Sequence, residues 1–199
     1  MAAGSMSVVI QNYNTLTRDI QNINKQSKKA VQRTISDFKS RGPGWVSQEV
    51  TKEYNIKKKD VNEAKKSVSK GGNKIKVAGT RVDNLSILYQ GRLLTPTHFK
   101  MKPTVRPENK APYTVTAQIR KGTGRKALGH KVFLAPSGSA GTIQIPFQRR
   151  GDARKPIDVI KTVSVPQMVT NEKVAEQIHK RINEELNKRL QHHLKNLVK

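Results

Sequence analysis

The sequence predicts an α+β fold: a long N-terminal helix and a short helical pair, an antiparallel β-sheet, and a long C-terminal helix. Two segments, one toward each end of the chain, carry apolar residues at helical spacing and predict the long helices. The middle of the chain is rich in Val, Ile, Thr, Tyr and Phe and is interrupted by Gly and Pro, which is typical of strands and turns. Helices and strands that occupy separate parts of a chain indicate α+β.

Length and composition favour one domain with a thin core. The chain has 199 residues, of which 34% are hydrophobic and 5% aromatic, below the usual share of a globular protein. We predict one domain over residues 6–199, with a helical region (6–68), a basic β region (74–165) and a C-terminal helix (166–199). The opening "MAAGS", residues 1–5, is interpreted as an expression scar outside the fold.

The net charge points to anionic partners. Lys and Arg number 39 against 14 Asp and Glu, which gives a formal charge of +25. Such a chain repels itself and favours nucleic acid, acidic proteins or both. The absence of cysteine excludes disulfides and thiolate metal sites. Since no apolar run approaches the roughly 18 residues of a membrane span, we expect no membrane partner.

The first long helix is predicted from Val8 to Phe38, where apolar side chains recur at helical spacing. Two glycines and a proline follow in the stretch "RGPGW". Because these residues disfavour helix, we predict that the helix ends there and that Trp45 anchors the chain after the break.

The next stretch, "VSQEVTKEYNIKKKDV" from Val46 to Val61, predicts two short crossed helices with the pattern of a helix-turn-helix. Asn55 is predicted at the left-handed turn position. The inward-facing residues are predicted to be Val50, Tyr54, Ile56 and Val61. A DNA-reading helix could use Asn62 on a base edge. Many helical pairs share this pattern without touching DNA, so we favour a packing unit.

The middle of the chain is predicted to form strands near residues 74–79, 97–102, 113–121, 131–135, 143–148 and 157–164. "KGTGRK" between two of them predicts a hairpin turn, and "APSGSAG" predicts a flexible loop. From Asn171, a plausible N-cap, apolar residues at almost every fourth position predict the last helix. They are Val174, Ile178, Ile182, Leu186, Leu190, Leu194 and Leu197. The sequence leaves open whether this stripe packs on its own sheet or on a neighbouring subunit.

The candidate functional residues are basic. Between Asp83 and Asp152 there are twelve Lys or Arg residues and one acid, Glu108. A band of this kind could contact phosphates without reading sequence, although a solvated face or a contact with acidic proteins would give the same pattern. The candidate contact residues are Lys57, Lys58, Lys59, Arg120, Lys121, Arg125, Lys126, Arg149 and Arg150.

No catalytic or metal-binding pattern is found. The sequence has no HExxH or GxSxG element and no paired carboxylates in the β region. "GTGRKALG" lacks the ending of a P-loop, and a hairpin turn explains it better. The three histidines of the last helix lack metal-ligand spacing, and we predict that His179, His192 and His193 are surface residues. We therefore expect a protein without enzymatic activity, metal or cofactor.

The segment "ARKPIDVIKTVSVPQMV", Ala153 to Val169, with the long helix after it, resembles the C-terminal signature of the phage minor tail protein Z family, also called tail completion proteins. The order of parts is similar over nearly the whole chain from Met6. The residues that carry the signature are Pro156, Ile157, Asp158, Ile160, Val165 and Pro166. We interpret it as a packing signature, in which the two prolines fix φ at the ends of a buried central strand that leads into the last helix.

This resemblance implies a structural protein of the virion neck, where head and tail join, with assembly in the host cytoplasm. Such a protein completes the tail for head attachment and forms part of the DNA passage. The implied partners are other tail and neck proteins (tail terminator, tail tube and head connector), further copies of the chain in a ring, and genomic DNA contacted without sequence preference. The alternative from the residues alone is a helix-turn-helix DNA-binding regulator, which would prefer one short site strongly over competitor DNA.

Overall fold

The computed structural model describes residues 6–7, 25–62, 74–108, 112–137 and 143–196. Contacts divide the chain into two compact units: unit 1 comprises Met1–Val50, Val61–Arg92 and Val165–Lys199, and unit 2 comprises Thr51–Asp60 and Leu93–Ser164. Long helices and antiparallel strands occur in separate stretches, which confirms the α+β prediction. All six predicted strand regions contain a strand, but in the described residues the strands form three three-stranded sheets rather than one.

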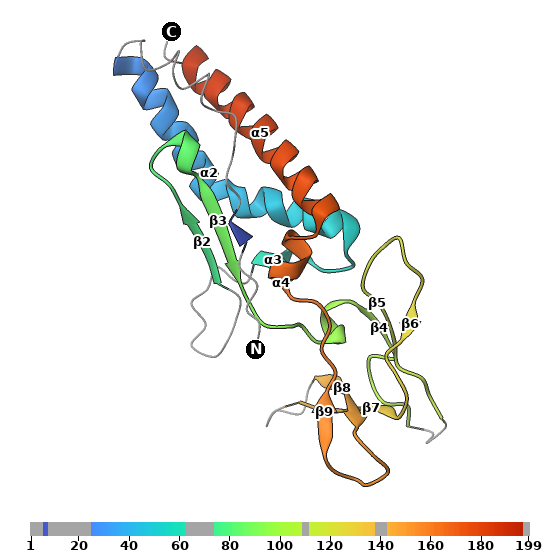
Figure 1. Cartoon of the computed structure of the whole chain (residues 1–199). Helices are drawn as coiled ribbons and strands as arrows, with labels where there is room; N and C mark the ends of the chain where they lie inside the picture. The colour runs from blue at the N-terminus through green and yellow to red at the C-terminus, as the bar shows by residue number, and fades with distance from the viewer. Residues whose placement is uncertain (1–5, 8–24, 63–73, 109–111, 138–142, 197–199) are drawn as a thin grey trace. The chain divides into compact units, whose positions relative to one another are not determined.

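Unit 1 holds the long helices. Helix α5 (Glu172–Lys195) runs beside helix α2 (Lys25–Glu53) (Figure 1). The last turn of α2 belongs to unit 2. The short helix α4 (Val165–Val169) precedes α5 in the sequence. A sheet of order β1-β3-β2 completes the unit, with β1 at Met6–Ser7, β2 at Lys74–Ala78 and β3 at Ser86–Gln90; the turn η2 (Val82–Asn84) lies between β2 and β3.

The apolar stripe of α5 is buried within its own chain. Val174, Ile178, Ile182, Leu186 and Leu190 are each at most 3% exposed. Leu194 is half-buried, and Leu197 lies outside the described residues. The helix begins after Asn171, as predicted, although the Asn171 side chain makes no capping hydrogen bond. The stripe is therefore part of the unit 1 core and is not a free seam for a neighbouring subunit.

Helix α2 does not end at the Gly-Pro-Gly stretch, so that prediction was wrong. The helix continues through Pro43 to Glu53, and Figure 1 shows it bending along its length. An internal proline loses one helical hydrogen bond and commonly kinks a helix without ending it when packing holds both sides. Here the packing is tight, because a Cβ on Gly42 would lie 3.0 Å from Cδ1 of Ile87 in β3. The predicted helical residues 8–24 lie outside the described residues.

A polar cluster links α2 to α5. The Asp37 Oδ2 atom lies 2.9 Å from Nε2 of His193 and 3.9 Å from Nη1 of Arg189. Arg41 approaches the other carboxylate oxygen at 3.7 Å. The prediction that His193 is a surface residue was wrong, since its side chain is only 15% exposed and its partner comes from a helix far away in the sequence.

Strand β3, which was not among the predicted strands, forms the centre of the unit 1 sheet. Its Ile87 and Tyr89 are fully buried, whereas Ser86 and Leu88 are half-buried. The Tyr89 hydroxyl has no hydrogen-bond partner among the described residues. Burial raises the pKa of this phenol above its ordinary value of 10.0.

Replacing Tyr89 with Phe is expected to make the protein less sensitive to alkali. Above pH 10 the unfolded phenol loses its proton while the folded one keeps it, so the wild type loses stability as the pH rises. By pH 11 this loss, relative to neutral pH, reaches about 1.4 kcal/mol, and the variant lacks it. Denaturant unfolding of both proteins at each pH gives the difference in their free energies of unfolding. The titration of the lysines is common to both proteins and cancels in this difference. Parallel pH profiles would contradict the burial of this hydroxyl.

Unit 2 is a β unit with a small core. Its first sheet has the order β4-β5-β6 (Lys100–Lys102, Thr116–Gln118, Lys126–Ala127), and its second has the order β7-β8-β9 (Val132–Pro136, Gln144–Arg149, Ile157–Val159). The turn η3 (Pro96–His98) precedes β4. One core cluster consists of Met101, Val115, Ala117 and Leu134. Residues 119–125 connect β5 to β6, which confirms the predicted hairpin.

The predicted central strand of the "KPIDVIK" signature was wrong. Strand β9 covers only three residues and lies at the edge of its sheet, paired to β8 alone. Ile157 is 40% exposed, and Ile160 is half-buried. The second half of the signature does reach a core, because Val165 and Pro166 are buried in α4 of unit 1. The first part of the signature therefore belongs to unit 2, and its last residues belong to unit 1.

Candidate anion-binding surface

All nine predicted basic contact residues belong to unit 2, and all are exposed. We call them the basic face. Unit 2 contains 18 Lys and Arg against 5 Asp and Glu in its sequence, a formal charge of +13. An excess of one sign on a small unit raises the local concentration of anions and accelerates their association.

The segment after α2 is extended and does not form the turn of a helix-turn-helix. Tyr54 forms an antiparallel bridge with Arg120, and the Asn55 N–H donates to the Ile119 carbonyl at 2.8 Å. Among the described residues only Lys131 has a positive φ outside glycine, so Asn55 does not take the left-handed position. The predicted turn instead joins the β5–β6 hairpin. The inward pattern itself is confirmed, since Val50, Tyr54, Ile56 and Val61 are buried.

The second predicted helix is represented by α3 (Lys58–Asn62), and residues 63–73 lie outside the described residues. Its Asn62, the candidate for reading a base edge, donates a hydrogen bond from Nδ2 to the Ser47 hydroxyl at 3.0 Å. Both residues belong to unit 1. This amide therefore helps hold α3 to α2 rather than projecting toward a duplex.

The hairpin arginines are held in place by their own unit. The Arg120 guanidinium lies 5.4 Å from the centre of the Tyr54 ring and donates to its hydroxyl at 3.3 Å. Arg125 donates from Nη1 to the Lys100 carbonyl at 2.7 Å. Lys121 is fixed through its backbone, whose N–H donates to the Glu53 carbonyl at 2.8 Å. These contacts bring the hairpin charges close to the segment that carries Lys57.

Arg149 and Arg150 lie at the other end of β8, roughly 20 Å from Ile143 at a strand rise of about 3.4 Å per residue. The Arg150 guanidinium binds Asp158 through two hydrogen bonds of 2.5 and 2.8 Å. The hydrogen bond from Arg150 lowers the pKa of Asp158. Lys131 pairs with Asp152 nearby. Arg150 is thus paired with the signature residue Asp158, and this ion pair joins the end of β8 to β9. We therefore do not assign Arg150 to an anion-binding site.

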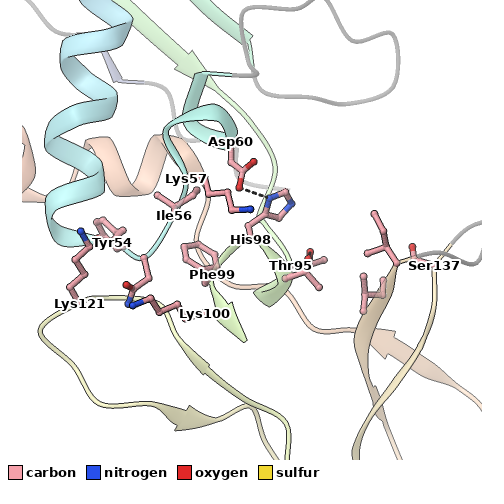
Figure 2. A pocket seen from close by; sticks show the side chains of 14 residues that line it. Tyr54, Ile56, Lys57, Asp60, Thr95, His98, Phe99, Lys100, Lys121 and Ser137 are labelled. Atoms are coloured by element: carbon pink, nitrogen blue, oxygen red, sulfur yellow. Dashed lines mark hydrogen bonds and ion pairs between the residues drawn. The ribbon is translucent and has the colours of Figure 1, made fainter. Parts of the chain in front are cut away.

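A cavity of about 900 Å³ lies within unit 2, and we call it the unit 2 cavity (Figure 2). It is built from three separate parts of the chain, with Lys121 from the hairpin: residues 54–60, the turn and strand start at 95–100, and the three residues Ser137, Ile143 and Ile145. Lys57, Lys100 and Lys121 contribute the basic side chains of its lining. Asp60 is the acid in the lining, and its Oδ2 lies 3.5 Å from Nδ1 of His98.

The structure thus brings together only part of the basic face. Lys57 and Lys121 line one cavity, Arg120 and Arg125 contact the lining residues Tyr54 and Lys100, and Arg149 and Arg150 lie elsewhere. Several other residues of the cavity, including Thr95, His98 and Phe99, were not among the predicted site residues. No local motif marks them, since the cavity forms only when three distant segments meet.

A model of the family described as "Prophage minor tail protein Z (GPZ)" matches residues 5–199, nearly the whole chain. No curated protein and no solved structure matches the chain. Among the described residues, no helix is long and apolar enough to cross a membrane, and no group of three or more acidic or histidine side chains is arranged to hold a metal ion.

Proposed function

We propose, because this chain belongs to the prophage minor tail protein Z family, that it is the tail completion protein at the head-tail joining region of a long-tailed phage. Membership alone makes it a structural component of the phage tail and a part of the virion, with other tail proteins as partners. In the proposed role it closes the top of the tail for head attachment, has no enzymatic activity, and forms part of the DNA passage. The observation that carries the proposal is the family match over residues 5–199.

The charge of unit 2 supports contact with the genome in that passage. Exposed lysines and arginines bind phosphates without reading bases, which suits a passage that admits any sequence. Among the described residues no observation favours the helix-turn-helix regulator, because Asn55 and Asn62 both make contacts within the chain.

The proposed ring of copies needs a subunit contact other than α5. The apolar stripe of α5 is buried in the core of unit 1. Four large hydrophobic residues of the described chain are exposed, and all of them belong to unit 2. They are Leu93, Val105, Ile143 and Ile157, exposed by 45%, 60%, 62% and 40%. Exposed apolar side chains are candidates for assembly contacts with copies of the chain, the tail terminator, the tail tube or the head connector.

Deleting the gene from the phage tests the proposal. We expect filled heads and separate tails to accumulate in the host cytoplasm, because the tail top lacks the protein that lets it join the head. Negative-stain microscopy of the lysate counts joined and separate particles, and a plasmid copy of the gene should restore joining. Normally joined particles after deletion, with or without altered phage transcription, would contradict the proposed function.

A further inference from the structure

We propose that the unit 2 cavity binds an acidic peptide segment that carries apolar side chains and belongs to a different protein. This inference adds a partner of stated chemistry to the proposed function. It rests on the cavity and its lining, and it does not depend on where in the particle the chain is placed.

The charge of the lining favours an acidic ligand. Lys57, Lys100 and Lys121 are exposed side chains that come from three different segments and line the same cavity. Figure 2 shows Lys57 beside the Asp60–His98 pair, and shows Lys100 and Lys121 on another wall. The one acidic side chain of the lining, Asp60, is already paired with His98. A carboxylate ligand would therefore meet three lysines. Carboxylates placed among such lysines gain Coulomb attraction, which salt weakens.

The lining also offers apolar surface. Ile56 and Phe99, each 6% exposed, form part of the walls, and Ile145 adds a half-buried side chain. Ile143 lines the cavity while 62% exposed, the largest exposed fraction among the large hydrophobic residues noted above. A mixed lining of this size is typical of sites that hold a short peptide or a small molecule.

The same features disfavour other occupants. A second copy of this chain would bring a further charge of +25 to a basic cavity. Duplex DNA would satisfy the lysines but presents phosphates and sugars at its surface, with no apolar side chains for Ile143 and Ile145. An extended peptide can do both, because it can carry carboxylate and apolar side chains together.

Fluorescence anisotropy with defined probes tests the proposal on the full chain. The probe is a labelled peptide in which glutamate and leucine alternate, and the comparison is a labelled peptide with the same number of glutamates and serine in place of leucine. We expect the leucine peptide to bind roughly tenfold more tightly, the gain from burying about one leucine side chain. Equal affinities would overturn the proposal, because charge alone would then explain binding.

Variants separate the cavity from the rest of the surface. K57E and K121E should each weaken the leucine peptide by roughly tenfold, whereas K161E, the same charge change at an exposed residue outside the cavity, should change its affinity by less than about twofold. Ile143→Ser, at a residue exposed enough to tolerate the change, should weaken the leucine peptide and leave the serine peptide unchanged.

A random-sequence DNA duplex completes the test. We expect Ile143→Ser to leave its affinity unchanged. If Ile143→Ser weakened the duplex as much as the leucine peptide, the cavity would be a nucleic-acid site and the proposal would fall. Neither result bears on the gene-deletion phenotype, so this inference and the proposed function can fail separately.

Discussion

Replacing Leu186 with Ala is expected to lower the free energy of unfolding of unit 1 by about 2–5 kcal/mol. Leu186 is fully buried at the middle of the α5 stripe, so truncation removes apolar contacts and leaves a cavity. The single tryptophan, Trp45, is itself buried in unit 1 and lies 6.4 Å from Phe38 between ring centres, so its fluorescence reports the unfolding of this unit. Denaturant titration followed at this residue gives the change in free energy.

Gln191→Ala is the matched control, because Gln191 is exposed on the same helix. Its effect should stay within about 0.5 kcal/mol. If Leu186→Ala cost no more than this control, α5 would not pack against its own chain, and the stripe would again be available to a neighbouring subunit.

Reversing three charges of the basic face, K58E, K121E and K126E together, is expected to weaken binding to random-sequence duplex DNA by roughly 10²–10³-fold at about 0.1 M salt. Each lost phosphate contact lowers the slope of log affinity against log salt concentration by about 1, so the slope should fall by about 3. All three side chains are exposed, and folding should be preserved. Anisotropy titrations over a series of salt concentrations measure both quantities.

A second triple variant controls for net charge. K39E, K180E and K188E make the same change in charge at exposed lysines of unit 1. We expect this variant to keep most of the affinity and the salt slope. Equal losses in the two triple variants would mean that DNA responds to the total charge of the chain, and the basic face would lose its role.

The long helices show what local patterns can and cannot predict. The α5 stripe was predictable because Ile178, Ile182 and Leu186 repeat at one period and all face one core. The end of α2 was not, since the local preference of Gly42 and Pro43 against helix is overridden by packing. Phe38 before the proline and Val46 after it are both fully buried, and these tertiary contacts have no signal in the local sequence.

The candidate site divides in the same way. Its charge was predictable from composition, and so was the position of the hairpin that carries Arg125 and Lys126. Which basic residues share a surface was not predictable. Arg150 forms an ion pair with Asp158, and the backbone at Asn55 is extended where a turn was expected. Such pairings join residues that are distant in sequence, so only the folded chain reveals which charges share a surface.

Electron cryo-microscopy of the neck of the intact phage particle tests the proposed position of this chain at the head-tail joining region. We expect density for this chain as a closed ring at the top of the tail, between tail and head, with Lys58 and the β5–β6 hairpin of unit 2 facing the DNA in the passage. Density for the chain at the far end of the tail, or a complete neck without it, would contradict the proposed function.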